Sequence, residues 1–456
     1  MATDPEIRTP LDRIAMVAPR PMRGRITEIT GQTLKARMPR ARLGEVVTIF
    51  DRGQAREARA VVVGKAQAEV VLSAVDRLAG FTLTADVIGS GQLPTFATGL
   101  APLGSVVDCF GRPLTGDDRP VVTDRAQPGD RRQVHPGLPA RLPFDREAPR
   151  PLARPQPRVP FETGVRAIDG PLTLAVGQRV GIFGAPGCGK STLLAMILGA
   201  ARADVAVIGL VGERGREVRE FLALLESGGA LDRSILVVAT SDRPAGERVC
   251  AAEAATAVAE AYRDLGADVL LVVDSVTRVA RAQREIGLAA GEMPTRRAFP
   301  VSAFTALPPL FERAGLTETG SITGLYTVLM EGDGVDDPVA EEVRGLLDGH
   351  IVLSERLAAE DHFPAIDVLK SRSRLMDQIV CPDHREAAQR LRHLQAAYED
   401  ISLLLKVGEY RSGADPTADH AIAVKDDIDG FLRQPLGVHA HVSDTVAAMA
   451  AAVSSP

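Results

Sequence analysis

The sequence predicts an α/β protein in three parts: a small all-β domain, a central domain built on a parallel sheet, and a helical C-terminal domain. Short runs rich in β-branched residues occupy residues 23–89, apolar strands alternate with helical stretches from Gly164, and helical periodicity prevails beyond Cys381. A chain of 456 residues exceeds one ordinary core. We therefore expect domains at 1–95, 96–380 and 381–456.

Composition and charge exclude several classes of protein. Hydrophobic residues make up 45% and charged residues 25%, as in soluble globular chains rather than disordered or fibrous ones. The net charge of −6 provides no basic field for nucleic acid, and the absence of a run of about 18 apolar residues argues against a transmembrane helix. The acidic N-terminus lacks the apolar stretch of a signal peptide, and the four cysteines have neither metal nor disulfide spacing. These features predict a cytoplasmic protein.

The first domain is predicted from short strands that turn residues separate. Gly31, Gly44, Gly64 and Gly80 lie between or beside runs rich in valine, isoleucine and threonine. Strands of this length and spacing predict a small sandwich or barrel. The runs are Arg25–Ile29, Glu45–Phe50, Ala60–Val63 and Val70–Leu72.

A connector is predicted over residues 128–160. Nine prolines interleave there with many arginines and few apolar residues. Proline removes backbone donors and fixes φ, so we expect an extended, solvated segment on the surface of the central domain.

The central domain is predicted from apolar strands joined by helices. Helices are expected from about Lys190, from about Arg214 and over Ala245–Leu265. Apolar strands with helical connections of this length imply parallel strands buried on both faces. The strands are Val180–Phe183, Val205–Val211, Ser234–Val238 and Asp268–Asp274. In the C-terminal domain we expect helices over Glu386–Leu405, Ala421–Leu432 and Val442–Val453.

A phosphate-binding loop follows the first central strand. The stretch from Gly184 to Ser191 fits G-x-x-x-x-G-K-[ST] between a strand and a helix. Glycines let backbone N–H groups curl around phosphate oxygens, and the helix N-terminus adds free donors and a favourable dipole. Lys190 can reach the β- and γ-phosphates, and the Ser191 hydroxyl can ligate Mg²⁺. The predicted nucleotide-binding residues here are Gly184, Ala185, Pro186, Gly187, Cys188, Gly189, Lys190, Ser191 and Thr192.

Two carboxylates are candidates for the rest of a phosphoryl-transfer site. Asp274 ends the most apolar strand, where it can bind the nucleotide's Mg²⁺ or, alternatively, cap the next helix. Glu213 follows the strand Val205–Val211 and can polarise an attacking water, which hydrolysis requires. The alternative for Glu213 is a charge favoured at a helix N-terminus. Positive charge is also needed at the γ-phosphate, but the chain has a surplus of arginines, and spacing alone selects none.

These residues, with a series of further motifs, resemble the export ATPases of bacterial type III secretion. That family has flagellar and injectisome branches and is related to the catalytic subunit of rotary ATP synthases. The resemblance extends from the β-domain to the C-terminal helices. Its motifs are Thr163–Gly170, Gly177–Phe183, Gly212–Val218, Ala239–Pro244, Asp274–Arg278, Ala282–Ile286, Glu331–Asp333, Asp348–Ser354 and Gly408–Tyr410.

The resemblance implies roles that spacing cannot assign. Glu213 matches the water-activating glutamate of the family, and Arg214 matches the adjacent arginine near the γ-phosphate. Arg374 matches an arginine finger that acts on a neighbouring subunit's nucleotide, although Arg372 places a second arginine beside it. Phe363 occupies the place of an aromatic that packs on adenine, with a core aromatic as the alternative.

The resemblance also implies an assembly and a function. It implies a homohexameric ring around a central stalk, in which each chain has an N-terminal β-barrel, a RecA-like P-loop motor domain and a C-terminal helical domain. The cofactors are ATP and Mg²⁺. The partners are stalk and stator proteins, export chaperones and their substrates, at the cytoplasmic side of the inner-membrane export gate, with no nucleic acid. The implied function is ATP hydrolysis that energises protein export through a type III secretion apparatus.

The sequence departs from the family pattern at some positions. Val279 stands where an aromatic is usual, and Gly334 replaces an acidic residue.

The sequence leaves alternatives to the function in protein export. One alternative is a ring subunit of a rotary ATP synthase or ion pump. Another is a non-catalytic nucleotide-binding ring subunit, which has no need for Glu213. A third is a ring helicase, for which the β-domain offers few aromatics, Phe50 and Phe81 among them.

Overall fold

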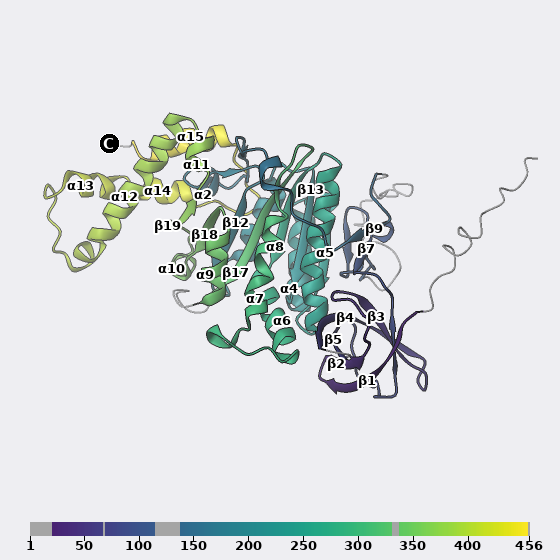
Figure 1. The fold of residues 1–456 in the computed structure, drawn as a ribbon. Helices are drawn as coiled ribbons and strands as arrows, with labels where there is room; N and C mark the ends of the chain where they lie inside the picture. The colour runs from purple at the N-terminus through teal and green to yellow at the C-terminus, as the bar shows by residue number, and fades with distance from the viewer. Residues whose placement is uncertain (1–20, 67–68, 115–136, 331–336, 455–456) are drawn as a thin grey trace, which may run out of the picture. The chain divides into compact units, whose positions relative to one another are not determined.

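The structure is a computed structural model that describes residues 21–66, 69–114, 137–330 and 337–454. It divides into two compact units, Met1–Leu93 and Pro94–Pro456 (Figure 1). The predicted boundary at residue 380 would divide the second unit further and stays a prediction. Part of the predicted connector (128–136), the motif 331–333 and Gly334 lie outside the described residues.

Six strands of the first unit close into a barrel in the order β1-β2-β5-β4-β3-β6. Alternate residues face inward, so that Leu34, Val47, Ile49 and Leu72 are fully buried in its core. Of the two predicted all-β architectures, the barrel is the one observed. The sequence analysis missed β2 and β6, which are short and carry charged residues. The strands are β1 (Arg23–Thr30), β2 (Thr33–Arg37), β3 (Val46–Asp51), β4 (Arg56–Ala66), β5 (Glu69–Ala74) and β6 (Asp86–Gly89).

A nine-stranded sheet forms the centre of the second unit. Its order is β19-β18-β12-β17-β15-β13-β14-β8, and β16 pairs with β17. Neighbours are parallel, as predicted, except for the antiparallel pairs β18–β19 and β16–β17. Figure 1 shows β19, β18 and β12 next to one another at one side of the sheet. The strands are β8 (Ser105–Val107), β12 (Arg179–Gly184), β13 (Val205–Val211), β14 (Ser234–Ala239), β15 (Asp268–Asp274), β16 (Gly315–Leu316), β17 (Ser321–Leu329), β18 (Gly349–Leu353) and β19 (Ile366–Ser373).

Helices cover both faces of this sheet. On one face α5 packs against β13, β14 and β15, and a Cβ on Gly209 would lie 3.1 Å from Ala255 of that helix. On the other face Ile208 and Leu236 join a core with α3, α4 and the C-terminal helices. The helices of the central part are α2 (Arg166–Asp169), α3 (Lys190–Ala200), α4 (Gly215–Ser227), α5 (Ala245–Asp264), α6 (Val276–Ala289), α7 (Val301–Thr305), α8 (Leu307–Glu312), α9 (Pro338–Leu346), α10 (Glu355–Ala359) and α11 (Met376–Ile379).

Four helices follow residue 380 within the described stretch 337–454, and one prediction about them is wrong. The single helix expected over Ala421–Leu432 is two helices that meet at Val424. The break lets fully buried Val424 and the residues of the second helix, among them Phe431, pack into the core beside Gly170. The helices are α12 (Pro382–Val407), α13 (Pro416–Ala423), α14 (Lys425–Leu432) and α15 (Val442–Ala452).

Short elements complete the second unit. Two small antiparallel pairs join β7 (Thr95–Ala97) to β9 (Arg141–Pro143) and β10 (Pro160–Phe161) to β11 (Leu174–Ala175). Short 3₁₀ turns are η1 (Thr98–Leu100), η2 (Pro151–Ala153), η3 (Leu231–Arg233) and η4 (Arg296–Ala298). Among the described helices, none combines the length and the apolar character that crossing a membrane requires.

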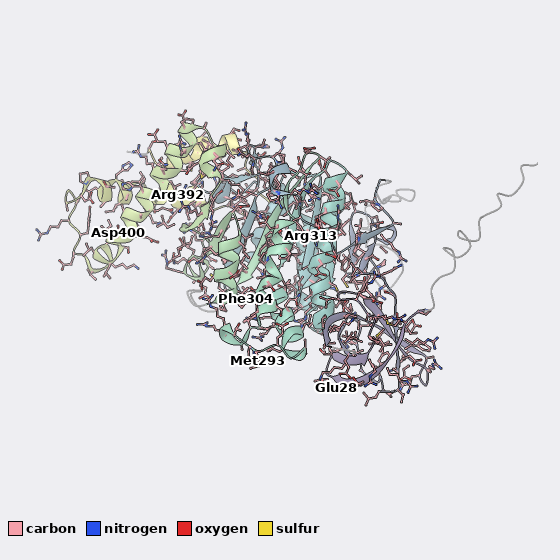
Figure 2. All side chains as sticks on the ribbon, in the orientation of Figure 1. Glu28, Met293, Phe304, Arg313, Arg392 and Asp400 are labelled. Carbon is pink, nitrogen blue, oxygen red and sulfur yellow. The ribbon has the colours of Figure 1, made fainter. Side chains whose placement is uncertain are left out.

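A buried ion pair fixes α5 to the segment after α8. Arg313, labelled in Figure 2, donates from Nε and Nη2 to the two carboxylate oxygens of Glu260 at 3.0 and 2.7 Å. Both residues are buried, and Arg146 Nε lies 3.6 Å from the same carboxylate. Removing Glu260 would therefore leave the buried Arg313 charge without this partner, at a cost of about 3–5 kcal/mol. The pair helps to fix the helical layer over the sheet.

Candidate active site

The phosphate-binding loop lies at the carboxyl end of a central strand. β12 ends at Gly184, and α3 begins at Lys190 with Gly189 as its N-cap. The φ angles of Gly187 and Gly189 are +90° and +82°. These angles lie in the left-handed region, which costs a residue with a Cβ about 1–2 kcal/mol. The stretch Gly184–Thr192 therefore has the strand–loop–helix geometry that the sequence predicts.

Lys190 lies between two carboxylates that come from neighbouring strands. Its Nζ is 2.6 Å from Asp274 Oδ1 and 3.8 Å from Glu213 Oε1. Asp274 ends β15 and is in register with Leu210 of β13, the strand that precedes Glu213. Because parallel strands end at the same edge, residues far apart in the sequence converge beside the loop. The structure thus brings Lys190, Glu213 and Asp274 together.

Arg278 holds Glu213 in place, a role that the sequence analysis did not assign. Its Nη1 lies 2.6 Å from Glu213 Oε2 and donates to the carbonyl of Gly212 at 2.7 Å. A Cβ on Gly212 would approach Arg278 Cδ to 2.9 Å, and Gly212 has a φ of +71°, so glycine is needed there. The signal was present in the sequence: Arg278 follows Asp274 by four residues and so lies in the first turn of the next helix, α6, at the same edge.

Thr327 is a second residue that the sequence analysis missed. Its Oγ1 donates to Asp274 Oδ1 at 2.5 Å, and both residues are buried. A hydrogen bond from an uncharged donor fixes the direction of the carboxylate without neutralising it. Thr327 lies on β17, whose place beside β15 follows from the sheet order rather than from sequence adjacency.

The environment of Glu213 suits a group that accepts a proton near neutral pH. Burial raises the pKa of Glu213 to about 7, and a hydrogen bond with Glu217 and the charge of Asp274 act in the same direction. Lys190 and Arg278 oppose this shift. The same hydrogen bond lowers the pKa of Glu217, which stays ionised. A carboxylate that titrates near 7 can take a proton from an attacking water.

Arg214 is placed differently from its neighbour Glu213. Its side chain is 79% exposed, and its guanidinium has Glu217 as an ion-pair partner at 4.0 Å. Its backbone N–H donates to Glu217 Oε2 at 3.4 Å, which caps α4. The location near the γ-phosphate that the resemblance implies for Arg214 stays a prediction.

A pocket of about 490 Å³ opens beside the loop, within the size range of ligand sites. Phe363 lies on its wall, and a Cβ on Gly189 would be 3.2 Å from the Phe363 ring. The ring is 39% exposed, which distinguishes Phe363 from the core aromatics of the chain. Thr192 lines the same pocket. The remaining wall is formed by Leu193, Met196, Asp361, Pro364, Arg433, Gln434, Pro435 and Leu436.

Gln434 connects the C-terminal residues of the pocket wall to Phe363 and to the segment that contains Gly164 and Arg166. Its backbone N–H donates to the carbonyl of Phe363 at 2.9 Å. Its buried side chain donates to the carbonyl of Gly164 at 2.7 Å and accepts from the backbone N–H of Arg166 at 2.8 Å. No sequence signal points to this role, because Gln434 follows Phe363 by more than 70 residues.

Arg374 lies at the opposite edge of the sheet. Ile366, at the start of β19, pairs with Leu353 at the loop end of β18, whereas Ser373 pairs with Gly349 at the other end. β19 is bulged between these two pairs, and Gly349 and Leu353 are four residues apart on β18, so at about 3.3 Å per residue Arg374 lies about 13 Å or more from the loop end of this strand pair. The structure therefore separates Arg374 from Lys190, Glu213 and Asp274.

The two arginines in this stretch differ in their attachment. The Arg374 guanidinium donates from Nη2 to the carbonyl of Arg344 at 3.2 Å, and its backbone N–H donates to Asp348. Arg372 lies within β19, opposite His350, and its side chain is exposed. Arg374 is thus the arginine at the end of the strand, held by the turn.

A phosphate loop at the carboxyl edge of a parallel sheet, beside a lysine and two carboxylates, defines the class of P-loop nucleotide hydrolases. Comparison with protein-family models agrees. Residues 164–373 match the nucleotide-binding domain of the ATP synthase alpha/beta family, and residues 380–451 match the C-terminal domain of the type III secretion ATPase EscN.

Comparison with individual proteins narrows the class to one family. The chain is 49% identical to the type 3 secretion system ATPase of Sinorhizobium fredii, covering 91% of this chain and 88% of the relative. It is 47% identical to the ATPase of Xanthomonas euvesicatoria, covering 95% of each. The assembled ATPase EscN of enteropathogenic E. coli matches with a TM-score of 0.86 and 44% identity, covering 94% of this chain and all of that one. The chain therefore belongs to the type III secretion system ATPases, and it is an ATP hydrolase of type III protein secretion.

Proposed function

We propose that the carboxyl edge of the sheet binds ATP and prepares a water for attack on its γ-phosphate. The observation that carries the proposal is the position of Lys190 between Asp274 and Glu213, at the mouth of the glycine loop. In this arrangement the loop and Lys190 bind the phosphates, and Glu213 takes the proton from the attacking water. Arg278 orients Glu213, and Phe363 packs on the adenine in the adjoining pocket.

Ser191 and Asp274 are the residues that we propose to hold Mg²⁺. Hydroxyl and carboxylate oxygens are the ligands that this hard cation takes, and both residues lie at the same sheet edge as Lys190. Mg²⁺, when bound, neutralises charge on the β- and γ-phosphates. Thr327 fixes the Asp274 carboxylate toward this edge.

We propose further that Arg374 completes the site of a neighbouring chain. Its position supports this, because Arg374 lies at the far end of the strand pair from its own loop, about 13 Å or more away, and its guanidinium contacts the carbonyl of Arg344 there. The relative EscN has been described as an assembled ATPase and in complex with its central stalk EscO. A homohexameric ring around a stalk is therefore the proposed assembly for this chain, with Arg214 near the γ-phosphate.

The proposed setting is the cytoplasmic side of an export gate in the inner membrane. Stator proteins, export chaperones and their substrates are the proposed partners, and membership of the type III secretion family supports them. Co-purification of the full chain with stalk and chaperone proteins of the type III apparatus from its own cells would test these partners directly.

The decisive experiment for the site replaces Glu213 by glutamine. Glu213→Gln keeps the size and a hydrogen-bonding group but removes the base, so ATP turnover should fall by about 10²–10⁴ while ATP affinity changes little. Glu220→Gln, on the helix α4 that follows Glu213, is the matched control, since Glu220 pairs with Arg216 on the exposed face. Turnover by Glu213→Gln at the wild-type rate would overturn the assignment.

Assembly is tested by dilution. The specific activity of the wild-type chain should fall when it is diluted below the concentration at which light scattering detects rings, because a lone chain lacks a finger. An activity that is independent of concentration while the mass falls to that of one chain would contradict an active site shared between chains.

A further inference from the structure

The turn that carries Arg374 is attached to the amino edge of the sheet through its backbone. The Arg374 N–H donates to the carbonyl of Asp348 at 3.0 Å. Asp348 precedes β18, and its own N–H donates to the carbonyl of Arg179, the first residue of β12. The base of Arg374 is thus two hydrogen bonds away from a central strand of the sheet.

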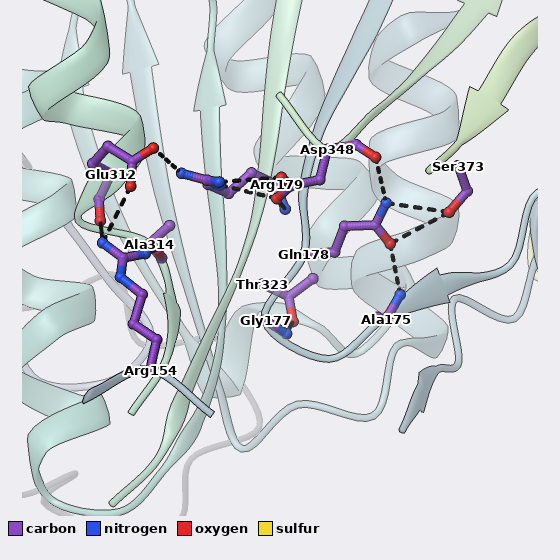
Figure 3. A network of polar contacts seen from close by, with 10 residues as sticks. All are labelled: Arg154, Ala175, Gly177, Gln178, Arg179, Glu312, Ala314, Thr323, Asp348 and Ser373. Atoms are coloured by element: carbon purple, nitrogen blue, oxygen red, sulfur yellow. Dashed lines mark hydrogen bonds and ion pairs between the residues drawn. The ribbon is translucent and has the colours of Figure 1, made fainter. Parts of the chain in front are cut away.

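Side chains reinforce this attachment, as Figure 3 shows. Both carboxylate oxygens of Asp348 accept hydrogen bonds from the Arg179 guanidinium, at 2.9 Å from Nε and 3.1 Å from Nη2. Asp348 Oδ2 also accepts from the backbone N–H of Arg179 at 3.1 Å. The side chains are 28% and 16% exposed, so solvent screens this bidentate pair only in part.

Gln178 joins the two strands that flank the turn. Its buried side-chain amide donates to the carbonyl of Asp348 at 3.1 Å and to Ser373 Oγ at 3.2 Å. Its side-chain oxygen accepts from the backbone N–H of Ala175 at 2.8 Å, which fixes the amide in one orientation. The carbonyl of Asp348 therefore receives two donors, Gln178 from inside the unit and Arg374 from the turn.

The close packing around this carbonyl requires a glycine. A Cβ on Gly349 would lie 2.8 Å from the carbonyl oxygen of Arg372 and 3.1 Å from Gln178 Nε2. On the other side, Arg179 Nη1 extends the network to Glu312 at 2.5 Å, and Arg154 binds the same glutamate. We name Gln178, Arg179, Asp348 and Ser373 the amino-edge network.

We infer that Gln178 and Asp348 are positioning residues for Arg374, holding its turn so that the guanidinium is presented to a neighbouring chain at a fixed place. The inference rests on the proposed function of Arg374. A long, exposed side chain contributes to catalysis only when its base is fixed, because a displacement of 1 Å at the reacting group can cost about 10²-fold in rate. The network supplies such a base, and it lies at the start of β12, whereas the phosphate loop of the same chain follows the end of that strand.

The first test separates positioning from binding. Asp348→Ala should lower kcat by about 10–10²-fold and leave KM for ATP within about twofold, because its own loop is untouched. Arg374→Ala should lower kcat by about 10³-fold, and the double variant should be no slower than Arg374→Ala alone. Asp367→Ala is the matched control, since Asp367 lies on the same strand pair and has Lys370 as its partner.

The second test uses mixed rings. Asp348→Ala chains keep an intact loop, and Glu213→Gln chains keep an intact Arg374. Rings assembled from equal amounts of the two should recover about a quarter of the wild-type rate if chains mix at random, well above either variant alone. Absence of recovery would mean that Asp348 serves its own chain's site, which would overturn the inference.

A parallel mixture separates this inference from the proposed function. If Arg374→Ala chains recover with Glu213→Gln chains and Asp348→Ala chains do not, only the positioning role fails. If Arg374→Ala alone keeps wild-type turnover, the proposal of a site shared between chains fails.

A second variant tests the positioning role if Asp348→Ala does not fold. Ser373→Ala removes only the hydroxyl that Gln178 binds. A kcat loss of about threefold or more with unchanged KM supports positioning, and an unchanged kcat contradicts it.

Discussion

The two edges of the nine-stranded sheet fix their functional side chains in different ways. At the carboxyl edge, glycines at positions 187, 189 and 212 shape turns around Lys190 and two carboxylates that face a common space. At the amino edge, a buried amide and an ion pair fix a turn whose arginine is exposed. The first edge is suited to enclosing a ligand, and the second to presenting one group outward.

Under the proposed function, one chain carries parts of two different sites. β12 links them, since its last residue opens the phosphate loop and its first residue, Arg179, holds the network beneath Arg374. The strand is buried in the sheet and separates the two parts within one chain. The proposed function therefore assigns the two parts that act on one nucleotide to neighbouring copies.

The largest effect is expected from a substitution at the carboxyl edge. Lys190→Ala should reduce ATP turnover by at least about 10³ and weaken ATP binding, because it removes the positive charge at the phosphates and leaves Asp274 and Glu213 facing each other. Turnover assays and calorimetric titration of ATP would measure both effects. Lys370→Ala, at a lysine with a 74% exposed side chain, is the control and should behave as wild type.

The next largest effect is expected from a substitution of Arg374 at the amino edge. Arg374→Lys keeps a positive charge but loses the planar fork of donors, so kcat should fall by about 10²-fold with KM nearly constant. Steady-state kinetics on assembled rings would measure this. Arg372→Lys, two residues earlier on the exposed face of β19, should change kcat by less than about twofold. The reverse ranking would assign the finger to Arg372.

The two edges also differ in how far the sequence predicts them. The bounds of β13 and β15 agree with the prediction at every residue, because strands buried on both faces are continuous apolar runs with charged or glycine residues at their ends. The loop is equally clear, since its backbone geometry requires glycines at fixed spacing. Lys190, Glu213 and Asp274 converge because each follows or ends a parallel strand.

The amino edge could not be predicted in the same way. β18 and β19 pair antiparallel, and β19 carries polar residues such as Asp367 and Lys370, so no apolar run marks it. The distance between Arg374 and its own loop depends on this register. Gln434 and Thr327 were missed for a related reason, because each reaches the site through tertiary packing rather than through a local pattern.

A smaller effect is expected from the pH dependence of kcat, which tests Glu213 at the carboxyl edge. Glu213 acts as a base only when ionised, so with a pKa raised to about 7, kcat should rise as pH increases through 7 and fall about tenfold per unit well below it. The free energy of unfolding depends on pH in the opposite direction. The folded chain favours the neutral form of Glu213, so the contribution of Glu213 to stability is present at low pH and is lost as pH rises through about 7. Rates and melting temperatures across pH 5–9 would measure both.

Arg278→Met sharpens this test. Removing the guanidinium 2.6 Å from Glu213 should raise the pKa of Glu213 further, moving the midpoint of the rate profile upward by about one unit and lowering the rate at pH 7 by about fivefold. Arg284→Met is the control on the same helix, since Arg284 lies over the Phe299 ring instead. A lowered rate with an unmoved midpoint would show that Arg278 does not act through Glu213.

The smallest effect concerns the pocket beside the loop. Phe363→Ala should raise KM for ATP by about fivefold and leave kcat nearly unchanged, because stacking on a base is worth about 1–3 kcal/mol and a half-exposed ring supplies the lower part of that range. Phe363→Tyr should keep the wild-type KM, since the ring face is retained. Phe304→Ala, at another partly exposed ring that packs on Phe299, controls for loss of apolar surface. Phe363 lies at the loop end of β19 and Arg374 at the other end, so Phe363→Ala should also leave complementation in mixed rings intact. A loss of complementation would mean that the two ends of the strand do not act independently.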